Sequence, residues 1–215
     1  MPHIRISELR LDSTVVVATG NPHKVTEIEE ILGPRMPGVR FVALGELGDF
    51  PEPVEDGSSF FDNAMIKARD ALDETGLLVA VADDSGLCVD SLGGAPGIFS
   101  ARFAGEPCDD AANNALLLKN LADKTDRTAR FVCAIACVFP EDVSRGYFVR
   151  GEVEGKIIDE YRGEGGFGYD PLFYYAPLKK TFAELTADEK NSISHRARAL
   201  ESFCVILKEK LKTND

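Results

Sequence analysis

The chain has 215 residues, 44% of them hydrophobic, which is enough to bury a sizeable core as one globular unit. Acidic residues outnumber basic ones by 36 to 24, and a net charge of −12 argues against binding to a nucleic acid polymer through the phosphate backbone. The first residues lack the apolar centre of a signal peptide, and no segment offers 18 consecutive apolar residues, so we expect a cytoplasmic protein with no membrane partner.

The first half of the chain alternates apolar runs with helical patterns. β-branched or continuous apolar runs predict buried strands at 14–19, 39–44 and 77–82. Apolar residues at helical spacing predict helices from the turn "TGNPHK" to residue 32 and over about 60–75, the latter capped by Ser58 or Ser59. Residues 45–57 are acidic and rich in Gly and Pro, so they are expected to be loop. The third strand is expected to end at Asp83 and Asp84.

The second half predicts a hairpin followed by a helix. Residues 92–105 carry too many turn formers for regular structure, and 109–122 resume a helical pattern. Residues 128–139 and 146–158 form long apolar or alternating runs, as in an antiparallel pair of strands. The last helix is expected to begin near Ser192 or Ser194 as its N-cap. Early strand–helix alternation and a late hairpin indicate an α/β fold with a mixed sheet.

The segment "TGNPHK" (19–24) could bind an anion. A short glycine turn that opens a helix exposes backbone N–H groups, the helix dipole favours negative charge there, and Lys24 adds a cation. The pattern is not a Walker A motif, and it is equally compatible with an ordinary capped turn.

Asp83 and Asp84 follow an apolar run, where an open α/β sheet usually holds its ligands. Together with the loop acids Glu52, Glu55 and Asp56 they could hold Mg²⁺, a cation that prefers oxygen ligands. In the alternative interpretation, one acid caps a turn and the other is solvated.

Two later segments could bind the rest of a ligand. In "GEGGFGYDPLF" (163–173) four glycines allow close approach of the backbone, and Phe167 and Tyr169 offer ring faces that suit a nucleobase. A glycine-rich hairpin loop with aromatic packing is the alternative. In "DEKNSISHRARAL" (188–200), the cations His195, Arg196 and Arg198 would lie near a helix N-terminus, which is unfavourable unless an anion lies there too.

The motifs "ATGNPHK", "EDGSSFFDNAMIKA", "ADDSGLCVDSLGGAPGIFSARFAG", "GGFGYDPLF" and "ELTADEKNSISHRARAL", in this order, closely resemble the inosine triphosphate pyrophosphatase family. The resemblance covers about residues 14–207 and leaves residues 1–13 as an N-terminal extension of a single domain that spans 1–215. Asp62 stands where the family usually has Glu, and His23 stands where it often has a small residue. The resemblance implies an elongated mixed sheet flanked by helices, with two lobes around a central cleft.

It also implies cleavage of ITP, dITP and XTP between the α and β phosphates, giving a monophosphate and pyrophosphate. Asp84 matches the family's catalytic acid, and Glu55 and Asp84 would hold Mg²⁺, with Glu52 as a competitor of Glu55. A homodimer is also implied. The residues that would bind substrate are Thr19, Gly20, Asn21, Pro22, His23, Lys24, Ser85, Phe167, Gly168, Tyr169, Asp170, Lys190, His195 and Arg196.

Other functions remain open from the residues. A pyrophosphatase acting on modified pyrimidine triphosphates would need much the same phosphate site, and a non-catalytic nucleotide-binding protein would keep the loops without needing Asp84. An aspartyl phosphatase would need D-x-D, but Ser85 and Gly86 follow the acids, and the serine hydrolase motif G-x-S-x-G does not occur.

Overall fold

The computed structural model describes residues 3–211, and within them the chain divides into two compact units. The first unit comprises residues 3–84, 134–150 and 198–211, and the second comprises 85–133 and 151–197. The chain passes from one unit to the other at four points, three of them in long strands and the fourth in the last helix.

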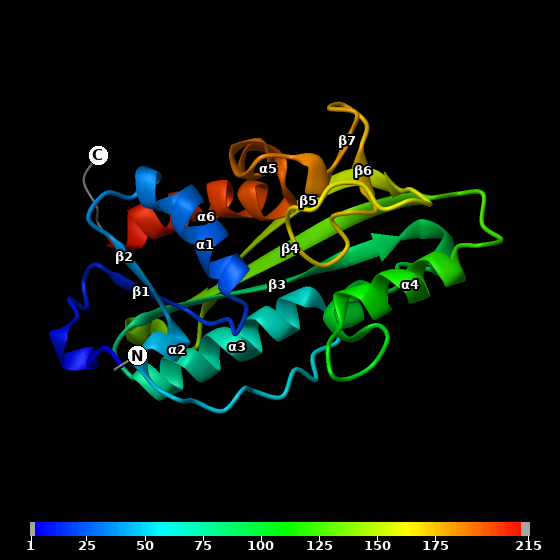
Figure 1. Ribbon diagram of the computed structural model, residues 1–215. Helices are drawn as coiled ribbons and strands as arrows, with labels where there is room; N and C mark the ends of the chain where they lie inside the picture. The colour runs from blue at the N-terminus through cyan, green and yellow to red at the C-terminus, as the bar shows by residue number, and fades with distance from the viewer. Residues whose placement is uncertain (1–2, 212–215) are drawn as a thin grey trace. The chain divides into compact units, whose positions relative to one another are not determined.

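Seven strands form one sheet (Figure 1). They are β1 (Thr14–Val17), β2 (Arg40–Ala43), β3 (Val79–Val89), β4 (Thr128–Val138), β5 (Gly146–Ile157), β6 (Phe173–Tyr175) and β7 (Lys180–Thr181), in the order β2-β1-β3-β4-β5-β6-β7. β1 pairs in parallel with β2 and β3, whereas β6 is antiparallel to β5 and β7. β4 and β5 are neighbours joined only by residues 139–145, too few for a parallel crossover, so they form the predicted hairpin. The predicted mixed α/β fold is confirmed.

All the α-helices in the described residues except α2 begin after a residue whose side chain accepts from an exposed N–H group of the first turn. They are α1 (Pro22–Leu32), α2 (Leu44–Leu47), α3 (Phe60–Thr75), α4 (Asp110–Asn120), α5 (Ala187–Ile193) and α6 (His195–Leu211). Short 3-10 helices cover Ile6–Glu8, Gly33–Arg35, Asp90–Leu92, Gly97–Arg102, Pro140–Asp142 and Phe182–Glu184. Ser59 caps α3 as predicted, and the variant Asp62 takes part in this cap because its carboxylate accepts from the Ser58 and Ser59 hydroxyls.

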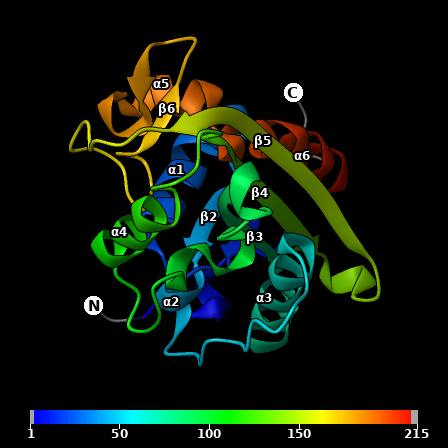
Figure 2. The ribbon, with the colours of Figure 1, turned by 90° about the vertical axis from the view of Figure 1, so that its right-hand side faces the viewer.

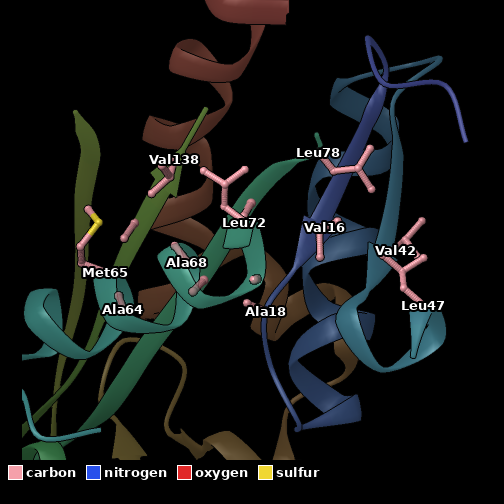
Figure 3. Close-up of a cluster of buried hydrophobic side chains, with 14 of the residues drawn as sticks. Val16, Ala18, Val42, Leu47, Ala64, Met65, Ala68, Leu72, Leu78 and Val138 are labelled. Carbon is pink, nitrogen blue, oxygen red and sulfur yellow. The ribbon is translucent and has the colours of Figure 1, made fainter. Parts of the chain in front are cut away.

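The core of the first unit lies on both faces of its strands. Alternate residues of a strand point to opposite faces, so Val16 and Ala80 lie on one face and Val15 and Val81 on the other. The first of these faces packs against the small residues of α3, seen in Figure 3. Figure 1 shows α1 and the first unit's part of α6 on the side opposite α3. Two helical layers therefore enclose the strands that carry the acidic residues.

The core of the second unit is largely aromatic. Phe131 of β4 lies 4.5 Å from Phe173 of β6 and 5.7 Å from Phe182, measured between ring centroids. Tyr169 and Leu172, which flank Asp170, are buried in the same cluster with Leu117 of α4. The glycine-rich segment is therefore anchored to this core at its C-terminal end.

Two sequence predictions about local structure are wrong, and one short helix was not predicted. The strand predicted for 77–82 does not end at Asp83 and Asp84, because β3 continues to Val89 and the two acids are interior residues with cationic partners. The predicted loop 45–57 begins with part of the short helix α2. Lys190 lies on a separate helix, α5, capped by Thr186, although the next helix does start after Ser194, whose hydroxyl accepts from the Ala197 N–H at 3.1 Å.

The N-terminal extension packs on the first unit. Ile4 and Ile6 contact its core, and the Ile4 N–H donates to the Glu46 carbonyl at 2.8 Å. Across residues 3–211, the structure has no helix that combines the length and the apolar character needed to cross a membrane.

Candidate active site

Two buried carboxylates in the middle of β3 are each paired with a lysine. Asp83 is 1% exposed and its Oδ1 lies 3.3 Å from Lys24 Nζ. Asp84 is 7% exposed and its Oδ1 accepts a 2.9 Å hydrogen bond from Lys67 Nζ. Neighbouring residues of a strand point to opposite faces, so the two acids recruit lysines from different helices, α1 and α3.

Lys67 connects Asp84 with the acidic loop. Its Nζ also lies 3.5 Å from Glu55 Oε2. Burial by itself would lower the pKa of Lys67, but attraction to Asp84, Asp83 and Glu55 outweighs burial and raises it, so the side chain stays charged. Burial raises the pKa of Asp84, and the nearby Lys67 and Lys24 only partly oppose that rise. The cluster thus holds a desolvated carboxylate beside a permanent cation.

Asn63 fixes the position of both Asp84 and the loop. It is fully buried, its Nδ2 lies 3.4 Å from Asp84 Oδ2, and its Oδ1 accepts from the Gly57 N–H at 2.9 Å. The sequence did not identify Asn63 or Lys67 as site residues, because the pattern that predicts α3 is formed by its apolar residues and not by its polar face. The available signal was their spacing of four residues, which places both on one face of the helix.

The turn before α1 is held by its own side chains. Thr19 Oγ1 accepts from the Asn21 N–H at 3.1 Å, and Asn21 Oδ1 accepts from the His23 N–H at 2.9 Å, which caps the helix that Pro22 begins. A Cβ at Gly20 would lie 2.8 Å from Glu52 Oε1, the end of an exposed and flexible side chain, so Glu52 lies close to this turn. Of the three loop acids, Glu52 therefore lies at this turn, Glu55 lies at Lys67, and Asp56 is exposed.

In the second unit, Asp170 organises the glycine-rich segment. Its Oδ2 accepts from the Phe167 N–H at 3.0 Å and from Lys190 Nζ at 2.8 Å, and the same ammonium group lies 4.7 Å from the centre of the Phe167 ring. Gly166 has a φ of +74°, and a Cβ there would come within 2.0 Å of the Asp170 carboxylate. Phe167 and Asp170, predicted from one motif, and Lys190, predicted from another, therefore form one cluster.

The remaining predicted residues of the second unit are also buried or paired. Arg196 is fully buried and donates from Nη2 to Ser85 Oγ at 3.0 Å. The His195 ring stacks on Phe131 with a centroid distance of 4.8 Å. Tyr169 donates its hydroxyl to the Ser100 carbonyl at 2.8 Å, and its pKa is raised by burial and by Asp110. Phe131 was not selected from the sequence, since it reads as an ordinary apolar strand residue.

The model of the Ham1 family matches residues 15–206 of this chain. The chain belongs to the Ham1 family. This Ham1 chain is 53% identical over 195 residues to a dITP/XTP pyrophosphatase of Desulforamulus reducens, covering 90% of this chain and 94% of that protein. It is 48% identical over 194 residues to the dITP/XTP pyrophosphatase of Bacillus subtilis, covering 89% and 96%. The solved Ham1 protein of Staphylococcus aureus matches with a TM-score of 0.81 at 39% identity, covering 92% and 99%. The family resemblance deduced from the motifs is confirmed.

Proposed function

We propose that this chain is an enzyme that hydrolyses the non-canonical purine nucleoside triphosphates ITP, dITP and XTP to the monophosphate and pyrophosphate. One observation carries the proposal: Lys24 and Lys67 each pair with one of the two adjacent buried acids of β3, Asp83 and Asp84. Cations in a largely desolvated site can bind a phosphate chain, and a carboxylate beside them can accept a proton from an attacking water molecule. The printed names of the relatives, dITP/XTP pyrophosphatase, agree with this chemistry.

We assign Asp84 the role of general base. A raised pKa brings a carboxylate closer to the pH at which it works, which makes proton abstraction from water more favourable. Lys67 is held at 2.9 Å from Asp84, so it would stabilise the ionised base and the charge that develops on the phosphate. Lys24, together with the turn of Thr19, Gly20 and Asn21, would bind the remaining phosphate oxygens.

Mg²⁺ fits the donor set of the first unit. Glu55 and Asp84 both lie close to Lys67 Nζ, so their oxygens are near one another, and Mg²⁺ is usually bound by one or two carboxylates together with substrate phosphates and water. We therefore propose Glu55 and Asp84 as its ligands. Bound Mg²⁺ would supply charge neutralisation at the phosphates, which a protein with a net charge of −12 needs to admit a triphosphate.

The second unit would select the base. The Phe167 ring offers a stacking face, and the backbone from Phe167 to Asp170 offers donors and acceptors. His195 and Arg196 would lie at the purine edge, where a donor favours the 6-keto group of hypoxanthine or xanthine over the 6-amino group of adenine. Lys190, whose ammonium group lies beside Asp170 and Phe167, would attract the negatively charged substrate.

We further propose that the chain acts as one cytoplasmic catalytic domain, residues 1–215, and assembles as a homodimer. The names of the relatives favour purine triphosphates over modified pyrimidine triphosphates. A purely binding protein would have no need of the paired, desolvated Asp84.

The decisive test is pyrophosphate release from ITP, dITP, XTP, ATP and GTP, with Mg²⁺ and with a chelator. We expect rapid release from the first three substrates, slow release from ATP and GTP, and no release with chelator. Equal rates on ITP and ATP would refute the specificity, and full activity with chelator would refute the metal. Gel filtration with light scattering tests the dimer.

A further inference from the structure

Helix α4 holds the two peptide groups on either side of Gly168 in the glycine-rich segment. The Gly168 N–H donates to Asp110 Oδ2 at 2.7 Å, and the Gly168 carbonyl accepts from Asn114 Nδ2 at 2.8 Å. Figure 2 shows α4 in green and the yellow-to-orange segment before β6 that carries Gly168. A residue whose N–H and carbonyl are both held has little freedom to change its φ and ψ.

The spacing on α4 makes this double contact possible. Asp110 and Asn114 are four residues apart, so their side chains lie on one face of the helix, one turn from each other. Gly168 has a φ of +60°, a conformation that orients its N–H and carbonyl in a way that other residues rarely adopt. The conformation of Gly168 therefore directs its N–H and its carbonyl to two side chains that lie one helical turn apart on α4.

Asn114 is a poor choice for packing alone. It is 3% exposed, and in the described part of the chain its Oδ1 is buried without a hydrogen-bond partner. An unsatisfied buried acceptor costs free energy, which an apolar side chain at this position would avoid. The contribution of Asn114 is thus its hydrogen bond to the Gly168 carbonyl.

We propose that Asp110 and Asn114 are positioning residues that determine base selectivity. By fixing the peptide groups on either side of Gly168, they set the orientation of the backbone between Phe167 and Asp170 that would meet the purine. The inference rests on the proposed function and extends it, since it places the control of selectivity on α4, outside the segment that touches the base.

The test compares variants of the full chain by steady-state kinetics with ITP and GTP, and by inhibition with tripolyphosphate, which has no base. In Asn114→Ala and Asp110→Ala we expect KM for ITP to rise about three- to tenfold, which is the change in affinity that the loss of one hydrogen bond would cause. The value of kcat should change much less. The ITP-to-GTP preference should fall by a similar factor, and the inhibition constant of tripolyphosphate should stay constant. Asp110→Asn keeps the acceptor and should restore KM to within about twofold of the unsubstituted chain.

Asn113→Ala is the matched control. Asn113 is the same residue type on the same helix, is 2% exposed, and bonds instead to the Ala101 carbonyl and the Ala104 N–H. Its replacement should lower the melting temperature at least as much as Asn114→Ala while changing KM and selectivity less.

Three outcomes would overturn the inference: an unchanged KM in both alanine variants, equal effects on KM from Asn113→Ala and Asn114→Ala, or a parallel change in tripolyphosphate inhibition. If Asn114→Ala fails to fold, Asp110→Ala decides alone, since Asp110 is exposed. Absence of ITP turnover in the unsubstituted chain would instead overturn the proposed function, so the two failures are distinguishable.

Discussion

The charged cluster of the first unit and the glycine-rich segment of the second are held together in different ways. The first is built from side chains of four distant segments, and its contacts are Lys–carboxylate pairs that can be exchanged for contacts with a phosphate. In the second, the groups that are held are backbone groups within a few residues of Asp170, fixed by the side chains of Asp170 and of α4, and the segment presents a fixed shape. The comparison predicts that substitutions in the first unit change the chemical step and that substitutions in the second change recognition of the base.

The largest effect is expected from Asp84→Asn. The amide keeps the size of the side chain but cannot accept the proton of water, so kcat should fall by about 10²- to 10⁴-fold. Nucleotide affinity should be largely retained. Pyrophosphate release gives the rate, and equilibrium titration with ITP gives the affinity. Unchanged turnover would show that another residue is the base.

A comparison of Lys67→Met with Lys190→Met separates the two units. Lys67→Met leaves the buried Asp84 without its hydrogen-bonded cation and should cost about 3 kcal/mol in the free energy of unfolding, with kcat as the kinetic parameter most affected. Lys190→Met should cost less, about 2 kcal/mol, because Asp170 still accepts the hydrogen bond from the Phe167 N–H. Its main kinetic effect should be a higher KM for ITP. Urea unfolding and steady-state kinetics measure both. Identical kinetic signatures in the two variants would remove the distinction between chemistry and recognition.

Two glycines test the fixed shape of the second unit. Both Gly166 and Gly168 have positive φ, so alanine costs about 1–2 kcal/mol in strain at either position. In Gly166→Ala the new Cβ would also displace the Asp170 carboxylate, whereas at Gly168 nothing lies within 4 Å of it. We expect Gly166→Ala to lower the unfolding free energy by about 3 kcal/mol and to raise KM more than Gly168→Ala does. Equal losses, measured by urea unfolding, would show that the Asp170 contacts contribute little.

Much of the fold could be predicted because it depends on local patterns. Apolar runs located β1 and β2, helical spacing located α1 and α3, and two serines, Ser192 and Ser194, marked the region where α6 starts, of which the structure selects Ser194. The extent of β3 could not be predicted in this way. Two adjacent acids predict the end of a strand, because burying an unpaired charge costs free energy. Their position inside β3 depends on ion pairs with the lysines of α1 and α3, which are far away in the sequence.

The same distinction applies to the site. Phe167 and Asp170 lie in one contiguous motif, so the sequence alone predicts that they belong to the same site. Asn63 and Lys67 lie on a helix whose polar face cannot be assigned to a partner until β3 is placed beside it. Family resemblance identified Asp84, but its pairing with Lys67 is a tertiary contact that no spacing in the sequence encodes.

The smallest effect concerns two cysteines, one in each unit. Cys137 of β4 lies in the core of the first unit, and burial, with a contribution from Glu141, raises the pKa of its thiol well above the ordinary value. The thiol therefore stays protonated at pH 8, where the reactive thiolate would otherwise begin to form. Cys108 of the second unit is exposed. With Ellman's reagent at pH 8, followed by peptide mapping, we expect Cys108 to react in the folded protein and Cys137 to react only in urea. Cys108→Ser should remove the reaction at that position and leave ITP turnover unchanged, whereas modification of Cys137 at the rate of Cys108 would mean that the strands of the first unit open more readily than their burial implies.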